Sequence, residues 1–274
     1  TVLYGTIFES SKLPLEKWFM LIGLMLNARK GISAMEIHRN LGVTYKTAWY
    51  SAMRVRCAMI DEVGMLEGIV EMDEAYLGGK PRHRSAPSNK ATLSNLTFKR
   101  GRGTKKVPIV GMVERGKRGR VVTEVAGKLN TKSMLELLHK YVNTEKTIMM
   151  TDDARFYHKF ENELQHLIIN HSKKQYVNGI IHTNTIEGFW SIVKNGIRGE
   201  FHVLSRKYLP FYLAEFAYKY NRRAKEQKAV AFEETVSNAV TDDKCLTDYK
   251  PKGDVSEIEK REKAREEPTS KPNA

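Results

Sequence analysis

Three carboxylic acids and one lysine have the types and the spacing that chemistry on a phosphodiester requires. Asp73 and Asp152 each come at the end of an apolar run that is typical of a buried strand. Glu187 and Lys194 lie seven residues apart in a helical pattern, so about 100° per residue returns the lysine to within about 20° of the glutamate. Two divalent cations held by carboxylates can activate an attacking oxygen and stabilise a leaving one. We therefore expect the three acids to bind two cations, with Asp73 bridging them, and the lysine to hold phosphate.

Each acid also has a purely structural interpretation. An Asp after a strand is often only a turn or cap residue, so the prediction depends on the three acids and the helix together. Glu74 and Asp153 directly follow the first two acids and could exchange roles with them, although we favour the strand-terminal residue of each pair. His182 lies five residues before Glu187 and could orient a ligand, contact substrate or be structural. The histidines of the second half lack the spacing of a zinc site.

A sheet is expected to position these residues, because the hydrophobic period changes from helical to strand-like near residue 69. Successive strands followed by strand and helix alternation indicate an α/β fold with a mixed sheet flanked by helices. The expected strands are 69–73, 107–113, 121–126 and 147–150, and the expected helices are 131–142, 155–167, 186–197 and 209–223.

Three helices are expected before the sheet, the first of them apolar nearly all round. Ser33 and Glu36 have the spacing of a capping box that opens a short helix ending near Gly42. Thr44 is placed to cap a third helix that continues to about Asp61. A short helix, a glycine-containing turn and a longer helix are typical of a helix-turn-helix, whose second helix enters the DNA major groove.

The positive charge is concentrated in one segment, which favours a polyanionic partner. The net charge is +14, and residues 80–120 hold thirteen Lys or Arg against one acid, Glu114. Neutralising phosphates with release of counterions drives binding to nucleic acids, although a solvated loop without a partner would have the same composition. The residues expected to contact DNA are Tyr45, Lys46, Thr47, Tyr50, Arg54 and Arg56 from the third helix and Lys80, Arg100, Arg102, Lys105 and Lys106 from the basic segment.

Composition excludes several classes of protein. The longest apolar run, 18–26, is about half of what a bilayer crossing requires, so we expect a cytoplasmic protein. The two cysteines, Cys57 and Cys245, are far apart and encode neither a disulfide framework nor a cysteine zinc site. The chain begins at Thr1 rather than Met, and we expect residues upstream of it.

With 274 residues the chain is long enough for two folded units and a tail. Beyond about Asp248 nearly all apolar residues disappear, which predicts a disordered or solvated end. The expected division is a helical DNA-binding domain at 1–66, a catalytic domain at 67–225 with a basic insertion at 78–106, and a charged C-terminal tail at 226–274.

Four motifs occur together in this chain. They are Met72 to Lys80, Thr151-Asp152-Asp153 with Tyr157, Asn170-His171-Ser172 with Tyr176, and His182 to Lys194 running on to Gly199. Together they resemble the DDE-type transposases of bacterial insertion sequences, in the group with a lysine seven residues after the third acid. The resemblance covers about residues 10 to 225, and its last motif is the most specific.

The resemblance implies an RNase H-like catalytic core after the small helix-turn-helix domain, and dependence on Mg²⁺ or Mn²⁺, with two ions. By matching position, Asp73, Asp152 and Glu187 would be catalytic metal ligands. Lys194 would hold DNA near them. The partners would be the terminal inverted repeats of the element and target DNA, bound by a homo-oligomer associated with the bacterial nucleoid. Some members replace the third acid, which draws attention to Asn184, and many carry a cysteine zinc ribbon that this chain lacks.

Two other classes remain open at this stage. One is a DNA-binding protein without catalysis, either a regulator or a domesticated transposase, against which the three intact acids argue. The other is a simple metal-dependent nuclease, which would hydrolyse DNA without joining strands. Assays of cleavage and joining separate all three.

Overall fold

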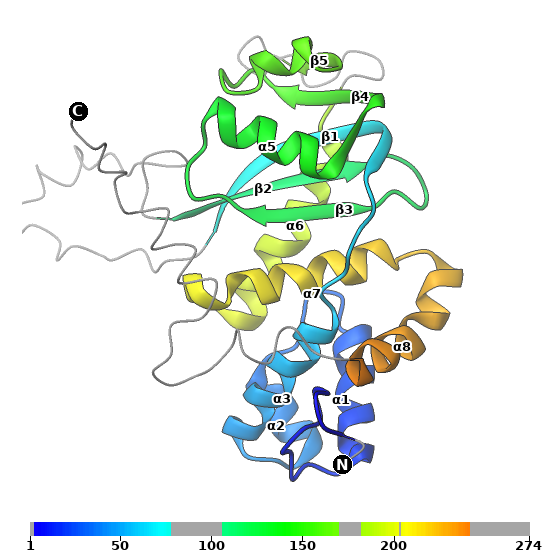
Figure 1. The fold of residues 1–274 in the computed structure, drawn as a ribbon. Helices are drawn as coiled ribbons and strands as arrows, with labels where there is room; N and C mark the ends of the chain where they lie inside the picture. The colour runs from blue at the N-terminus through cyan, green and yellow to red at the C-terminus, as the bar shows by residue number, and fades with distance from the viewer. Residues whose placement is uncertain (1–2, 78–105, 170–181, 203, 242–274) are drawn as a thin grey trace, which may run out of the picture.

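The structure, a computed structural model, describes residues 3–77, 106–169, 182–202 and 204–241. In this part of the chain a five-stranded mixed sheet stands beside a bundle of helices (Figure 1). The strand order is β3-β2-β1-β4-β5, with β1–β2 and β2–β3 antiparallel and β1–β4 and β4–β5 parallel. The strands are β1 (Leu66–Leu77), β2 (Val107–Glu114), β3 (Val121–Val125), β4 (Val142–Asp152) and β5 (Gln165–Ile169).

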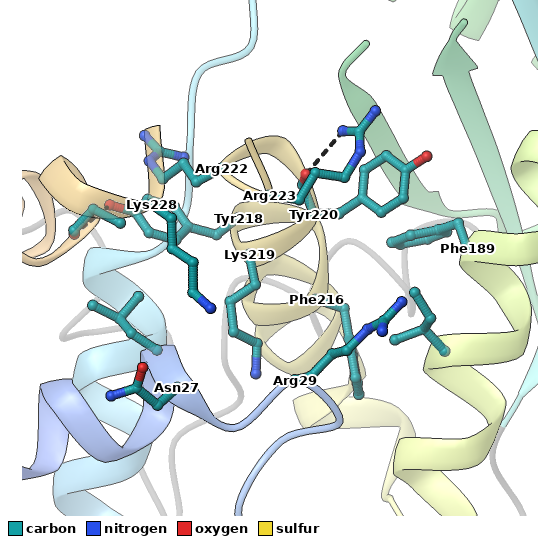
Figure 2. Close-up of a pocket in the computed structure, with 13 residues that line it drawn as sticks. Asn27, Arg29, Phe189, Phe216, Tyr218, Lys219, Tyr220, Arg222, Arg223 and Lys228 are labelled. Atoms are coloured by element: carbon teal, nitrogen blue, oxygen red, sulfur yellow. Dashed lines mark hydrogen bonds between the residues drawn. The ribbon is translucent and has the colours of Figure 1, made fainter. Parts of the chain in front are cut away.

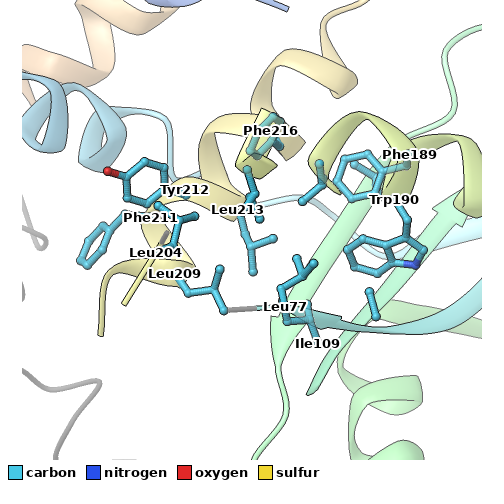
Figure 3. Close-up of a cluster of buried hydrophobic side chains, with 14 of the residues drawn as sticks. Leu77, Ile109, Phe189, Trp190, Leu204, Leu209, Phe211, Tyr212, Leu213 and Phe216 are labelled. Carbon is cyan, nitrogen blue, oxygen red and sulfur yellow. The ribbon is translucent and has the colours of Figure 1, made fainter. Parts of the chain in front are cut away.

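Helices cover both faces of the sheet, which explains why its central strands are apolar on both sides. Val70 and Met72 of β1 point to the face covered by α5, and Ala75 and Leu77 point to the other face. There they pack with side chains of α6 and α7 in the cluster of Figure 3. The three covering helices are α5 (Thr131–Tyr141), α6 (Asn184–Gly196) and α7 (Leu209–Asn221).

The N-terminal helices form where local capping signals predicted them. The Ser33 hydroxyl accepts a hydrogen bond from the Glu36 amide at 3.2 Å, and the Thr44 hydroxyl accepts one from the Thr47 amide at 3.2 Å. Gly42 ends the second helix with φ 60, in the left-handed region that glycine adopts readily. The bundle consists of α1 (Leu15–Asn27), α2 (Ala34–Leu41), α3 (Tyr45–Ala58) and α8 (Lys225–Val240).

The expectation of a disordered tail from residue 226 is wrong for residues 226–240, which belong to α8. Ala231, Thr235 and Ala239 are spaced by four residues and are all buried. They form a narrow stripe of small side chains, and the helix packs against α1 and α3. Small residues give a weak hydrophobic signal, which is why the pattern was missed.

The interpretation of Arg56 as a phosphate contact is wrong. Its side chain is 2% exposed and its Nε donates to the Glu215 carboxylate at 2.8 Å. Glu215 is fully buried on α7 and also accepts from the Lys219 ammonium at 2.6 Å. Arg56 therefore joins α3 to α7 in the interior instead of facing DNA.

The prediction of a helix at 155–167 is also wrong. This segment forms a short 3₁₀ helix and then β5, which extends the parallel ladder beyond β4. Phe160 is fully buried within the 3₁₀ helix, so its apolar side chain does not indicate an α-helix here. The remaining short elements are a 3₁₀ helix at His158–Asn162, a π-helical turn at Ile197–Phe201 and a 3₁₀ helix at Arg206–Tyr208.

Some predictions fall on residues that the structure does not describe. The basic insertion lies outside the described residues except for Lys106, as do residues 242–274 of the tail and the motif at 170–176. None of the described helices has both the length and the apolar character needed to cross a membrane.

Candidate active site

Asp73 and Asp152 lie on neighbouring parallel strands. The last residues paired between β1 and β4 are Glu71 and Met150, and each aspartate is two residues further along its strand. Because side chains alternate along a strand, both aspartates lie on the face that Glu71 and Met150 share. Burial raises the pKa of Asp73 to about 7, and the negative charge of Asp152 adds to this effect. The structure thus brings the first two predicted acids together.

The helix that carries the other two predicted residues covers the same face. Gly111 of β2 is paired with Asp73, and a Cβ atom on it would lie 2.6 Å from a ring carbon of Trp190 and 3.0 Å from Ile186. The missing side chain therefore lets α6 approach the sheet at the level of Asp73. Lys194 is exposed, and its positive charge lowers the pKa of Asp73, opposing the effect of burial.

Glu187 is in the first turn of α6 and is exposed, as the spacing predicted. Its carboxylate accepts a hydrogen bond from the Thr183 hydroxyl at 3.4 Å. Within residues 3–77, 106–169, 182–202 and 204–241, no three acidic, histidine or cysteine side chains are close enough to hold a metal ion. The site therefore shows a pair of aspartates with a lysine nearby, and Glu187 stands apart from that pair.

The aspartate pair has the chemistry of a hard-cation site. Carboxylate oxygens are the ligands that Mg²⁺ and Mn²⁺ prefer. The raised pKa of Asp73 comes from burial first and then from neighbouring carboxylates, Glu74 and Asp152, and a bound cation relieves both causes. The residues of the pair fit the chemistry of one metal position.

The neighbouring acids have other contacts. Glu74 points to the opposite face of β1 from Asp73 and accepts a hydrogen bond from the Tyr157 hydroxyl at 3.1 Å. Burial raises the pKa of Tyr157 above its ordinary range, with the charge of Glu74 next in effect. Asp153 lies 3.2 Å from a ring nitrogen of His158. Each of these neighbouring acids therefore has a side-chain partner outside the aspartate pair.

Sequence reasoning missed Glu71, which is fully buried on the same face of β1 as Asp73. It accepts hydrogen bonds from the start of α6 and forms an ion pair with Arg115. Its signal in the sequence was an acid at an inward position of an apolar strand, two residues before Asp73. Such an acid is stable only with partners, so it points to a charged cluster.

The residues predicted to contact DNA from α3 have different surroundings. Tyr45 is 52% exposed, Lys46 is exposed and lies over the ring of Tyr50, and Thr47 takes part in the helix cap. Arg54 donates to the backbone carbonyls of Ile7 and Glu9, which ties down the N-terminal segment. From the basic segment, Lys106 is exposed before β2, while Lys80, Arg100, Arg102 and Lys105 lie outside the described residues.

A cationic pocket of about 480 Å³ is lined by side chains of α6 and α7, of the start of α8 and of the segment around Arg29 (Figure 2). None of the described residues that line it is an acid. Phe189 of α6 forms part of the lining. Lys219, Arg222 and Arg223 bond to protein oxygens. Arg29 and Lys228 are exposed and form no ion pair with any described residue. The lining cations are Arg29, Lys219, Arg222, Arg223 and Lys228.

The amino-acid sequence of the sheet and of its covering helices matches a transposase family. The ISXO2-like transposase domain matches residues 65–221, which run from β1 to the end of α7. The chain belongs to this family.

A curated relative is an uncharacterized protein in transposable element ISH50 of Halobacterium salinarum. It is 32% identical over 197 residues, which are 69% of this chain and 64% of the relative. The chain thus spans less than two thirds of the length of that relative.

Two solved structures are also similar to the chain. A pre-cleavage Mos1 transpososome is 13% identical, with 86% of this chain and 82% of that chain covered and a TM-score of 0.32. A simian T-cell lymphotropic virus intasome in complex with PP2A regulatory subunit B56 gamma is 12% identical, with coverage of 75% and 65% and a TM-score of 0.31.

Proposed function

We propose that this chain is the catalytic transposase of an insertion sequence, which cuts DNA at the ends of the element and joins those ends to target DNA. The observation that carries this proposal is the pair of Asp73 and Asp152 on neighbouring strands inside the segment that matches the transposase family. The helix that bears Glu187 and Lys194 covers the same face of the sheet.

We assign the sheet to the RNase H-like class on its topology. Three antiparallel strands in the order β3-β2-β1 are followed by β4 and β5, which run parallel to β1. The first acid comes from the central strand and the second from the end of its parallel neighbour. The third acid is proposed to come from α6, a helix that follows β5 and packs against β1 and β2.

In this mechanism the residues of the chain hold the metal ions and neutralise the charge of the DNA phosphate. Asp73 and Asp152 would hold the metal, with Glu187 completing a second position. Bound Mg²⁺ or Mn²⁺ would supply an activated attacking oxygen and a stabilised leaving oxygen. Lys194, two turns after Glu187 on the same helical face, would neutralise a phosphate. Hydrolysis adds water across a phosphodiester P–O bond at the end of the element and leaves a 3′-hydroxyl and a 5′-phosphate. In joining, that 3′-hydroxyl gives up its proton and forms a P–O bond to a target phosphate, while the P–O bond to the target's own 3′ oxygen breaks and leaves a 3′-hydroxyl on the target strand.

DNA is the proposed partner, and α2 and α3 are proposed to bind it as a helix-turn-helix. The turn between them is three residues long, Gly42 to Thr44, and the exposed start of α3 presents Tyr45 and Lys46. The two ends of an element must be held together for joining, so we propose that a homo-oligomer assembles on the terminal repeats. The basic segment that contains Lys106 would add contacts with phosphates.

Replacing Arg29 and Lys228 together with Ala is expected to weaken DNA binding to the same degree for every sequence. Each lost phosphate contact lowers the slope of log affinity against log salt by about 0.9, so we expect a decrease of about 1 to 2. The measurement is a fluorescence anisotropy titration of duplex DNA at several salt concentrations. The control is Lys128→Ala with Lys132→Ala, two exposed cations near α5 on the far face of the sheet. An unchanged slope in the first variant would show that Arg29 and Lys228 do not contact DNA phosphates.

The decisive test is cleavage and joining of labelled DNA that carries candidate ends of the element, with Mg²⁺ or Mn²⁺. We expect the native chain to cut and then join, and Glu187→Gln to abolish both, while Asn184→Ala, at the exposed first residue of α6, retains them. Hydrolysis without joining would indicate a nuclease. Binding without either reaction would indicate a non-catalytic DNA-binding protein and would contradict the proposal.

A further inference from the structure

A buried glutamate holds the beginning of the helix that carries the third acid. Glu71 is completely buried, and a buried carboxylate is costly unless its oxygens are paired. Oε1 accepts from the Thr185 hydroxyl at 2.8 Å and Oε2 from the Ile186 amide at 2.9 Å. Both oxygens are therefore used by α6, which leaves Glu71 unsuited to be a metal ligand.

The helix does not cap itself. Thr183 precedes α6, and its side chain makes no capping hydrogen bond. An N-terminal turn has free amides and a positive end, which favour an acceptor with negative charge. Glu71 supplies that acceptor from β1, so the start of α6 is fixed by the strand that also holds Asp73.

Arg115 fixes the residues just before the helix. Its Nε donates to Glu71 at 2.5 Å, and one terminal nitrogen donates to the carbonyl of His182 at 2.5 Å and to its ring Nδ1 at 2.9 Å. The amide of Arg115 donates to the carbonyl of Ile69 at 2.8 Å, so the arginine is itself held by β1. His182 thus has a structural contact with Arg115 just before α6 begins.

We propose that Glu71 is a positioning residue for Glu187, acting with Arg115 and His182 as a clamp between β1 and the start of α6. This inference rests on the proposed function, because it assigns Glu187 to the reaction. Ile186, whose amide the clamp holds, directly precedes Glu187. The clamp therefore sets where the third acid stands relative to Asp73, and displacements of about 1 Å at such sites lower rates by about 100-fold.

The variant that tests the clamp is Glu71→Gln, which keeps the size of the side chain but removes its charge and one acceptor oxygen. The matched control is Glu114→Gln on β2, an acid paired with Arg120 at 2.6 Å that has no contact with α6 in the described residues. Thermal unfolding first establishes the temperature at which each variant is fully folded. All other measurements are made below it on the full chain with Mg²⁺.

Amide hydrogen exchange reports the clamp directly. We expect Glu71→Gln to raise exchange in residues 184–190 by about 10-fold, the scale of a lost helix cap, and Glu114→Gln to leave it unchanged. In the cleavage assay we expect kcat to fall by 10-fold or more in Glu71→Gln, while KM for DNA stays within about twofold. A purely structural role would reduce activity only in proportion to the folded fraction.

The outcomes separate the clamp from the proposed function. Unchanged exchange, or an unchanged kcat in fully folded Glu71→Gln, overturns the inference. If the native chain cuts no DNA, the proposed function and the assignment to Glu187 fail. Exchange of the Ile186 amide in the two variants then still decides whether Glu71 holds α6.

Discussion

Asp73→Asn is expected to abolish metal-dependent cleavage and, without metal, to make the folded protein more stable above pH 7. Asparagine keeps the shape of the side chain but loses the charge that binds a divalent cation. Losing several kcal/mol of transition-state stabilisation corresponds to a rate decrease of about 10³-fold or more. The gain in stability has a separate cause, because the carboxylate is partly buried beside Glu74 and Asp152.

The stability of the native chain should fall with rising pH, because folding raises the pKa of Asp73. The pKa of Asp73 rises from 3.8 to about 7 on folding, so the folded state disfavours the ionised form. The native chain therefore loses stability as the pH rises from about 4 to about 7, and this loss is complete above the folded pKa. Asp73→Asn has no carboxylate to ionise and keeps its stability over this range. Its free energy of unfolding should therefore equal that of the native chain near pH 4 and exceed it by about 2 to 4 kcal/mol above pH 7.

Denaturant unfolding in EDTA across this pH range measures the effect, and the same experiment with Mg²⁺ tests metal binding. Added Mg²⁺ is expected to stabilise the native chain and not Asp73→Asn. Asp153→Asn serves as the control, because Asp153 is an exposed acid beside the second aspartate. A native chain and Asp73→Asn with parallel pH profiles would show that Asp73 has no unusual ionisation.

Short-range patterns predicted most elements that position the candidate site. The caps at Ser33 and Thr44 depend on residues three positions away, and both form as predicted. The spacing of Glu187 and Lys194 depends only on helical geometry, and both residues are exposed on α6. Elements whose signals lie within one or two turns can therefore be predicted from a single sequence.

Contacts between distant segments could not be predicted in the same way. Glu71 meets Ile186, which is 115 positions away, and Arg56 meets Glu215, which is 159 positions away. The residues next to Glu71 and Glu215 in the sequence do not indicate which distant residue each acid contacts. For Arg56 the composition of the chain was misleading, because a basic protein has buried arginines as well as arginines that face DNA.

The sequence predicted the individual residues of the candidate site but not how the fold brings them together. Asp73 and Asp152 come together only through the register of two parallel strands, which no local pattern specifies. The strand beyond them, β5, was mistaken for a helix because its short apolar run has no clear period. Where Glu187 stands relative to the aspartates depends in turn on α6 and its anchor at Glu71.

Glu215→Ala is expected to lower the free energy of unfolding by about 3 to 5 kcal/mol, the cost of leaving a buried charge without its partner. Arg56 is 2% exposed and Lys219 is 9% exposed, and both depend on this carboxylate. Arg56 also lies over the ring of Tyr212, at 4.0 Å, so it cannot turn to solvent without giving up that contact. The variant should loosen the junction of α3 with α7.

Chemical denaturation of the native chain and of Glu215→Ala at several pH values tests this. Burial alone would raise the pKa of Glu215, but Lys219 and Arg56 lower it below the ordinary 4.5. Its stabilising effect is therefore present above about pH 4.5 and is lost as the pH falls through the folded pKa, so the two curves should converge in acid.

The matched control is Glu234→Ala, which breaks an Arg–Glu pair of α7 and α8 in which the glutamate is 45% exposed. Solvent screens that pair, so its loss should cost less than about 1 kcal/mol. Similar effects for the two variants would mean that Arg56 reaches water when Glu215 is removed. In that case α3 and α7 would be joined by the apolar cluster around Phe216 and Tyr212 rather than by the ion pair.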